Sequence, residues 1–151
     1  MHKRLFKPCL AFALCAFAAC LCGSAQATAA NTVSATNAWI RWLPGELPLA
    51  GYVNLHNDGA QARKLVGASS PDCKRIQLHH SMKMRDGMET MKPVAYVTVP
   101  AHGEFRFAPG DYHLMMWRKH AFKIGAKVPV LLQFADGARL RVLFTVKGAG
   151  Q

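Results

Sequence analysis

The chain has 151 residues, of which 51% are hydrophobic and 18% are charged, and its formal net charge at pH 7 is +11. This length is sufficient for one domain with a buried core and excludes a second domain. The excess of positive charge leaves a nucleic acid, an anionic membrane surface or an acidic protein as partner classes.

Residues 1–27 have the pattern of a cleaved secretory signal peptide. A basic start is followed by an apolar run at 9–22, which is shorter than the roughly 20 residues of a membrane span, and Ala25 and Ala27 form an A-x-A cleavage site. We therefore expect cleavage after Ala27, a periplasmic domain over 28–151, and no stable membrane insertion after cleavage.

Most of the cysteines lie in the expected signal peptide. Four of the five cysteines lie in it, so the exported chain keeps only Cys73 and forms no internal disulfide. A lipoprotein acylated at Cys20 is the alternative, but Phe17 and Ala18 stand where a branched aliphatic residue is usual. Cys73 is expected to be buried and inert, with a reactive thiol or a cross-link between two copies as the other readings.

Loss of the leader still leaves a basic protein. The chain after residue 27 has sixteen Lys and Arg residues and eight Asp and Glu residues, which gives a net charge of about +8. The basic residues are scattered, and export argues against nucleic acid as a partner. Either a solvated surface that keeps the protein soluble or docking to an acidic protein accounts for the charge.

Short apolar or alternating segments recur about every ten residues, and none longer than a turn has helical spacing. Turn sequences such as Asn57-Asp58-Gly59 and Asp86-Gly87 separate them. This pattern predicts an all-β domain, either a sandwich or a Greek-key barrel. The expected strands are 32–42, 49–56, 63–68, 75–80, 88–91, 94–99, 103–107, 113–118, 128–134 and 139–147.

Asp136-Gly137 gives the clearest signal of a two-residue hairpin. In the strand that follows, Leu140, Val142 and Phe144 alternate with polar or exposed positions, so this hairpin is expected to have one wet face. The three tryptophans are expected to anchor the core. For Trp117 the alternative is a position beside a metal site, where its ring would shield the ion from solvent.

Methionine is concentrated in one stretch of the chain. A single methionine usually fills a gap in a core, but six of them within residues 82–116, several in polar sequence around turns, exceed what packing requires. Histidines accompany them. The candidate donors in this stretch and just before it are His79, His80, Met82, Met84, Met88, Met91, His113, Met115 and Met116.

Strand geometry selects four of these donors. His113 and Met115 are two apart on an expected strand, so their side chains leave one face about 7 Å apart. His79 alternates with Ile76 and Leu78 and is expected to face away from the core. The turn at Asp86-Gly87 allows the chain to fold back and bring Met91 toward His79.

Two imidazoles and two thioethers form a soft, neutral donor set that favours Cu(I) over zinc and over hard cations. No Ser-His-Asp order, carboxylate pair, Gly-rich phosphate loop or CxxC motif points to an enzyme, and four protein donors leave no open position for a substrate. Exchange of the ion is the more natural function.

The same residues resemble the fingerprint of the periplasmic copper chaperones of the PCuAC type: His, an optional Met, ten residues, Met, twenty-one residues, then His-x-Met. Further resemblance extends over nearly the whole mature chain, in AWIRW, AGYVNLHN, KLVGASSP, KPV, APGDYHLM and VPVLLQFADG. The spacing of this chain fits the fingerprint throughout. His79 is the first His and His80 stands in the place of the optional Met. The ten residues 81–90 then precede Met91, and the twenty-one residues 92–112 precede His113, Leu114 and Met115.

This resemblance implies a cupredoxin-like β-sandwich with a surface Cu(I) site of His79, Met91, His113 and Met115. It also implies delivery of copper to the CuA centre of cytochrome c oxidase, often together with a Sco-type thiol protein. The chain departs from the family in two ways. His80 replaces the optional Met, and further methionines surround the site as auxiliary donors or as packing: Met82, Met84, Met88 and Met116.

We therefore expect a monomeric periplasmic copper chaperone that holds one Cu(I) and passes it to an acceptor protein. A copper buffering or resistance protein without a dedicated recipient is the alternative, and several ions per chain would favour it. An electron carrier of the cupredoxin type is disfavoured because no cysteine lies near the histidines in the sequence.

Overall fold

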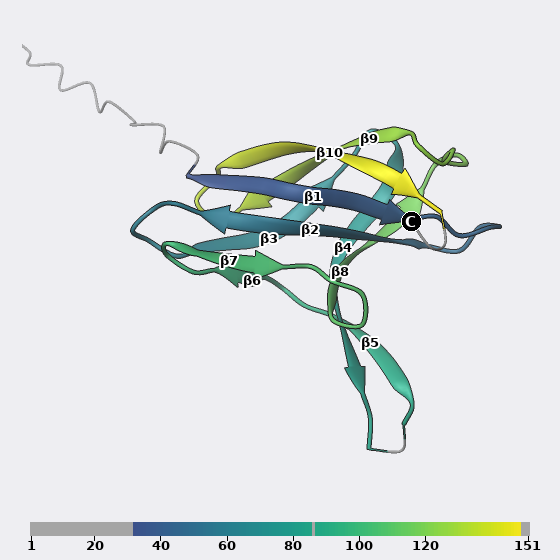
Figure 1. Ribbon diagram of the computed structural model, residues 1–151, viewed down its shortest axis with the longest axis horizontal. Helices are drawn as coiled ribbons and strands as arrows, with labels where there is room; N and C mark the ends of the chain where they lie inside the picture. Colours follow the sequence, from purple (N-terminus) through teal and green to yellow (C-terminus); the bar gives the residue numbers. More distant parts are fainter. Residues whose placement is uncertain (1–31, 86, 149–151) are drawn as a thin grey trace, which may run out of the picture.

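The computed structural model describes residues 32–85 and 87–148, where the regular structure is entirely β-strand (Figure 1). No helix in this part of the chain is long and apolar enough to cross a membrane. Every expected strand is present, which confirms the all-β prediction; the leader lies outside the described residues. The strands are β1 (Val33–Arg41), β2 (Leu49–Asn57), β3 (Arg63–Ser69), β4 (Cys73–Lys83), β5 (Glu89–Pro93), β6 (Val97–Val99), β7 (Gly103–Arg106), β8 (Tyr112–Arg118), β9 (Lys127–Phe134) and β10 (Arg139–Lys147).

The strands form one open sheet in the order β5-β4-β8-β2-β1-β10-β9-β3-β6, with β7 paired to β2 off this path. β1 and β10 run parallel, and the other described pairs are antiparallel. The sheet curls so that β3 contacts β4 and β6 contacts β7. Its two halves thereby enclose a shared core, and the molecule is a cupredoxin-like β-sandwich of one domain.

Alternation along the strands builds this core. On β10, Val142, Phe144 and Val146 are buried, whereas Arg141 and Leu143 are exposed, which confirms the expected wet face. Burial of an aliphatic or aromatic side chain stabilises the fold by roughly 1.5–3 kcal/mol. The largest fully buried side chains are Phe107, Phe144, Ile40, Leu49, Leu55, Leu65, Leu114, Met116 and Leu132.

The β9–β10 loop is longer than the expected two residues. β9 ends at Phe134 and β10 begins at Arg139, and Gly137 has φ of 85°. The Gly137 amide donates to the carbonyl of Phe134 at 3.0 Å, and the Phe134 amide donates to Ala138 at 2.9 Å. Asp136-Gly137 thus supplies a turn followed by a left-handed glycine, which is the pattern of longer hairpin loops.

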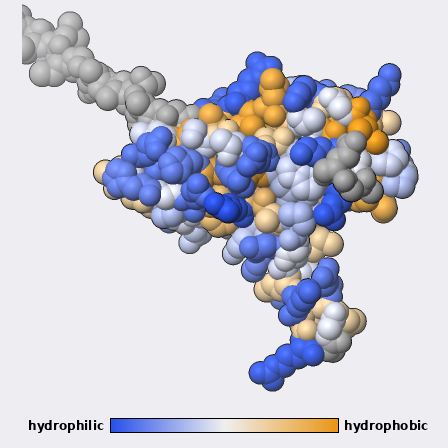
Figure 2. Space-filling view, viewed as in Figure 1, coloured by the Kyte–Doolittle hydropathy of each residue, from blue (hydrophilic) through white to orange (hydrophobic). Residues whose placement is uncertain are grey.

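The hairpin of β4 and β5 projects from the sandwich body, as Figures 1 and 2 both show. It arises because β4 continues to Lys83, beyond its pairing with β8, and β5 folds back along this extension. Gly87 has φ of 83° at its tip, where a residue without Cβ is favoured. This is the fold-back that the turn at Asp86-Gly87 predicts, and it places Met91 opposite Ser81 on β4.

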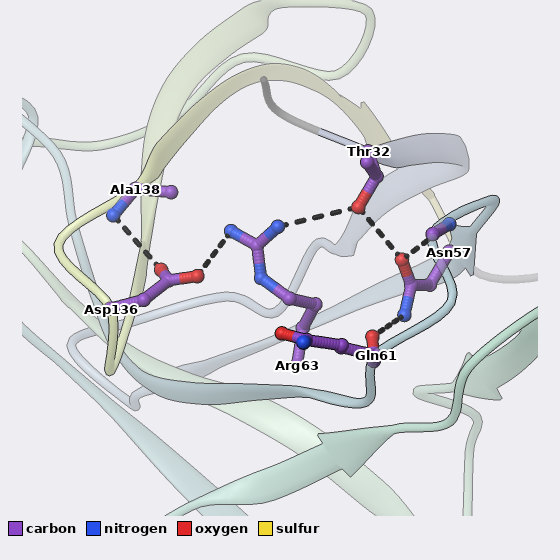
Figure 3. A network of polar contacts seen from close by, with 7 residues as sticks. Thr32, Asn57, Gln61, Arg63, Asp136 and Ala138 are labelled. Carbon is purple, nitrogen blue, oxygen red and sulfur yellow. Dashed lines mark hydrogen bonds and ion pairs between the residues drawn. The ribbon is translucent and has the colours of Figure 1, made fainter. Parts of the chain in front are cut away.

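A buried polar network joins three loops near the start of β1 (Figure 3). Arg63 is buried, and its Nη2 lies 2.7 Å from Oδ2 of Asp136 while its Nη1 donates to Thr32 Oγ1 at 3.3 Å. Thr32 in turn donates to the amide oxygen of Asn57 at 2.9 Å, and Asn57 donates to the carbonyls of Gln61 and Pro100. The network gives the buried Arg63 charge one ion pair and one hydrogen bond, near the start of β1 and away from the β4–β5 hairpin.

Candidate metal site

The register of β4 and β8 brings two imidazoles together. His79 and His113 are direct partners across the two strands, and their ring centroids are 5.7 Å apart at an interplanar angle of 56°. Ile76 and Leu78 on β4 and Leu114 on β8 are buried in the core, so the alternating histidines leave by the opposite face. We call this the outer face, and it matches the orientation expected for His79.

Two thioethers share the outer face with the imidazoles. Met115 follows His113 by two residues on β8, and Met91 on β5 pairs with Ser81, which follows His79 by two residues on β4. Met91, His113 and Met115 line one shallow pocket of about 240 Å³. His79 is not part of the pocket wall, but its ring lies next to the His113 ring. The structure therefore brings three of the four predicted donors to one pocket and places the fourth beside His113.

His79 is the least satisfied of the four. Its side chain is 9% exposed, and within the described part of the chain neither ring nitrogen has a hydrogen-bond partner. A buried polar atom left without a partner costs about 1–3 kcal/mol, so such atoms call for an explanation. A metal ion bound to one of these nitrogens supplies one.

His113 has one nitrogen fixed by the backbone. Its Nδ1 lies 3.2 Å from the carbonyl oxygen of Asp111, which also accepts the amide of Ser81 at 3.1 Å. A proton on Nδ1 satisfies that contact and leaves the lone pair on Nε2 free to bind a metal. The turn before β8 thereby orients the ring.

Electrostatics favour neutral imidazoles. Burial lowers the pKa of His79, and the positive charges of His113 and Arg75 lower it further. Burial also lowers the pKa of His113, although its contact with the Asp111 carbonyl acts in the opposite direction. At neutral pH both rings are therefore uncharged and have lone pairs available for a soft ion.

Two of the auxiliary donors lie away from the four. His80 occupies the other face of β4, where its Nε2 lies 3.1 Å from the Asp111 carboxylate and its ring stacks on Tyr112 at 4.1 Å. Met116 is completely buried in the core, so the structure removes it from the candidate donors. It lies two residues after the buried Leu114 on β8 and therefore faces the core.

The other three methionines follow the projecting hairpin. Met82 is half-buried on the same face of β4 as His80, whereas Met84 and Met88 are 50% and 65% exposed on either side of the turn. The Met84 amide donates to the Met88 carbonyl at 2.7 Å. These side chains surround the tip of the hairpin rather than the histidine pair.

Sequence reasoning missed several residues around the pocket. Arg41 and Glu89 line it together with Met91 and His113. Arg75 stacks on Trp117 with its Cζ 3.8 Å from the ring centroid, and the Trp117 ring meets His79 edge-on at 6.2 Å. The sequence offered only AWIRW as a signal for Arg41, since strand order could not be deduced from it.

Two tryptophans correct the expectation of core anchors. Trp117 is half-buried on the outer face beside His79, and Trp39 packs on Tyr52 with ring centroids 4.6 Å apart on that same face. Trp42 does pack against the core, and its Nε1 donates to the Phe122 carbonyl at 3.1 Å. Alternation on β1 and β8 places the first two outside because their neighbours Ile40 and Met116 fill the core.

Several solved structures share this fold. The copper-bound PCuAC domain of PmoF2 has a TM-score of 0.64 at 18% identity and covers 78% of this chain and 93% of that one. The Cu(I) form of DR1885 from Deinococcus radiodurans has a TM-score of 0.61 at 31% identity, with 85% of each chain covered. Fold and site together define a PCuAC-type domain, which confirms the resemblance read from the sequence.

Sequence comparison identifies the family within this class. Residues 33–146 match the model of the LpqE-like family, whose description is that of a lipoprotein. Lxx21020 of Leifsonia xyli subsp. xyli (strain CTCB07), which also has a lipoprotein name, is 32% identical over 120 residues, covering 78% of this chain and 71% of that protein. The chain belongs to the LpqE-like family.

Proposed function

We propose that this protein is an exported copper chaperone that binds one Cu(I) through His79, Met91, His113 and Met115 and transfers it to an acceptor protein. The observation that carries the proposal is a pocket on the outer face that is lined by two thioethers and one neutral imidazole, with a second neutral imidazole beside the first. The copper-bound domain of PmoF2 and the Cu(I) form of DR1885 support it as relatives of the same fold.

Donor chemistry and exposure both suit transfer of the ion. Thioether and imidazole ligands favour Cu(I) over hard cations. Met91 is 55% exposed whereas His113 is 4% exposed, so the ion is reached from the Met91 side. Four protein donors leave no position for a substrate, and we propose binding and exchange rather than catalysis.

We further propose that the protein acts in the periplasm as a monomer and does not bind nucleic acid. The recipient is the CuA domain of cytochrome c oxidase or a Sco-type protein, as the PCuAC resemblance implies. The lipoprotein names of its family and relative support export and strengthen the alternative of acylation at Cys20. The mass of the protein isolated from cells distinguishes acylated Cys20 from cleavage after Ala27.

Titration with Cu(I) against a chromophoric chelator tests the site. The wild-type protein is expected to bind one ion tightly, and the Met91→Ala, His113→Ala double variant to lose at least a hundredfold in affinity. His120→Ala is the matched control, because this exposed histidine lies next to Asp72, away from the pocket. Unchanged affinity in the double variant would remove the assignment.

Copper buffering without a dedicated recipient is the second candidate. The exposed Met84 and Met88 on the projecting hairpin favour it as additional soft donors. Stoichiometry separates the two functions: one tight ion that moves to an isolated CuA domain or Sco-type protein supports delivery, whereas several ions that stay bound support buffering.

A further inference from the structure

Two arginines lie on the outer face, one in the pocket wall and one near His79. Arg41 on β1 pairs with Ala50 on β2, and Ala50 pairs with Met115 on β8, so the three side chains stand in one row across the sheet. Arg41 is also part of the pocket wall. Arg75 lies on the other side, opposite Trp117 in the register of β4 and β8.

Aromatic rings hold both guanidinium groups in place. The Cζ of Arg41 lies 5.7 Å from the ring centroid of Tyr52, and that of Arg75 lies 3.8 Å from the centroid of Trp117, the ring that meets His79 edge-on. Such cation–π contacts restrict long side chains that would otherwise move freely in solvent. Among the described residues no carboxylate forms an ion pair with either arginine.

One carboxylate opposes these charges at the pocket. Glu89 lines it and is the direct partner of Lys83 across β4 and β5. Asp111 is nearby, but its carboxylate faces His80 on the other side of β4. Two fixed positive charges therefore lie near the four neutral donors, Arg41 in the pocket wall and Arg75 on the Trp117 ring beside His79, and Glu89 is the exposed negative charge in the wall.

We infer that Arg41 and Arg75 give the pocket selectivity for monovalent over divalent cations. The inference rests on the proposed function, because it concerns the ion held by the same four donors. Imidazoles bind Cu(II) and Zn(II) well, so the donor set alone discriminates incompletely. Repulsion from a fixed charge is proportional to the charge of the ion, so each arginine disfavours a divalent ion twice as strongly as Cu(I).

The magnitude follows from Coulomb's law at the edge of a protein. When the guanidinium and the bound ion are near each other but not in contact, each arginine is expected to lower the affinity for the ion about three- to tenfold per unit charge of the ion. Removing one arginine is thus expected to raise the Cu(I) affinity about three- to tenfold. The Cu(II) affinity should rise by about the square of that factor, because the ion carries two charges. The ratio of Cu(II) to Cu(I) affinity rises three- to tenfold for each arginine.

The experiment measures Cu(I) and Cu(II) affinities by competition with chelators in Arg41→Gln and Arg75→Gln. Cu(II) binding at the pocket is the part that a further His113→Ala substitution removes. A tenfold rise in the affinity ratio corresponds to a 59 mV fall in the potential of the bound Cu(II)/Cu(I) couple. Glu89→Gln should shift the ratio in the opposite direction.

Conservative variants separate charge from packing. Arg41→Lys and Arg75→Lys keep the positive charge and are expected to retain the wild-type ratio, as is Arg141→Gln on the exposed side of β10. The inference is overturned if the Gln variants leave the ratio unchanged, if the Lys variants shift it equally, or if no variant binds Cu(II) at the pocket. Failure of the wild type to bind Cu(I) at all would instead overturn the proposed function.

Discussion

The imidazole of His79 lies where a polar ring adds little to the stability of the metal-free protein. Both nitrogens are buried without a hydrogen-bond partner in the described structure, and the pKa of the ring is lowered by burial and by nearby positive charge. Its neighbour His113 differs, because the Asp111 carbonyl accepts from its Nδ1. The two histidines therefore contribute differently to stability and to binding.

Replacement of His79 by leucine should separate these contributions. We expect His79→Leu to raise the free energy of unfolding of the metal-free protein by about 1 kcal/mol, because it removes buried unsatisfied nitrogens. The same variant should lose Cu(I) affinity by at least a hundredfold. Denaturant unfolding and chelator competition measure the two effects, and a destabilisation of 2 kcal/mol or more would show that the ring is satisfied without a metal.

Cys73 provides a test that depends on pH. Burial raises the pKa of its thiol from 9.0 to about 11, mainly by desolvation. The folded state thus favours the protonated thiol: this stabilisation is fully present below pH 9 and is lost as the pH rises through 11. At pH 8 the thiolate fraction is about a hundredfold lower than in the unfolded chain.

Alkylation with iodoacetamide at pH 8 should therefore be at least a hundredfold slower in the folded protein than in denaturant. The rate should increase as the pH approaches 11. Rapid alkylation of the folded protein at pH 8 would contradict the burial of this thiol and support a reactive role.

At the scale of elements, the projecting β4–β5 hairpin controls how the site assembles. Met91 lies on β5, an edge strand whose described pairing is with β4. The two histidines and Met115 lie on strands paired within the sandwich body. In the proposed site, Cu(I) therefore connects this edge hairpin to strands of the sandwich body.

Hydrogen exchange should report this coupling. Amides of β5 are expected to exchange much faster than those of β8 in the metal-free protein, and Cu(I) is expected to slow exchange in β5 at least tenfold while changing β8 little. A Met91→Leu variant should lose the slowing in β5. Equal protection of β5 with and without Cu(I) would exclude Met91 as a ligand.

Strands and their facing were predictable from sequence, because alternation and turn residues are local signals. The orientations of Ile76, Leu78 and His79 followed from period two alone. The spacing of His113 and Met115 also required only strand geometry. Local signals sufficed for each donor taken separately.

Pairing between distant strands was not predictable in this way. The direct opposition of His79 and His113 depends on the pairing of β4 with β8, and the presence of Arg41 at the pocket depends on the pairing of β8 with β2; both pairs join strands that are far apart in the chain. Trp39 was expected in the core because apolarity does not reveal which face of a strand is covered. Trp117 takes the alternative position that was left open for it, beside His79. Met116 was left open between an auxiliary donor and packing, and it lies in the core.

Across the whole molecule, the buried polar network and the proposed metal site lie apart. The network of Arg63, Asp136, Thr32 and Asn57 (Figure 3) lies near the start of β1, which is away from the β4–β5 hairpin (Figure 1). Arg63 is 8% exposed, so the carboxylate of Asp136 offsets part of the cost of burying its positive charge. Removing one partner of a buried pair costs more than replacing the charge by an apolar side chain.

Asp136→Ala is accordingly expected to destabilise the protein by about 2 kcal/mol, and Arg63→Met by less. Neither should change Cu(I) affinity by more than about twofold. Denaturant unfolding and chelator titration provide the two readings. A large loss of Cu(I) affinity in Asp136→Ala without unfolding would contradict the separation of the two regions.

X-ray absorption spectroscopy of the Cu(I)-loaded protein tests the proposed ligand set. We expect a copper ion surrounded by two nitrogen and two sulfur scatterers, supplied by His79, His113, Met91 and Met115. A copper shell without sulfur, or with the scatterers of a single histidine, would contradict it.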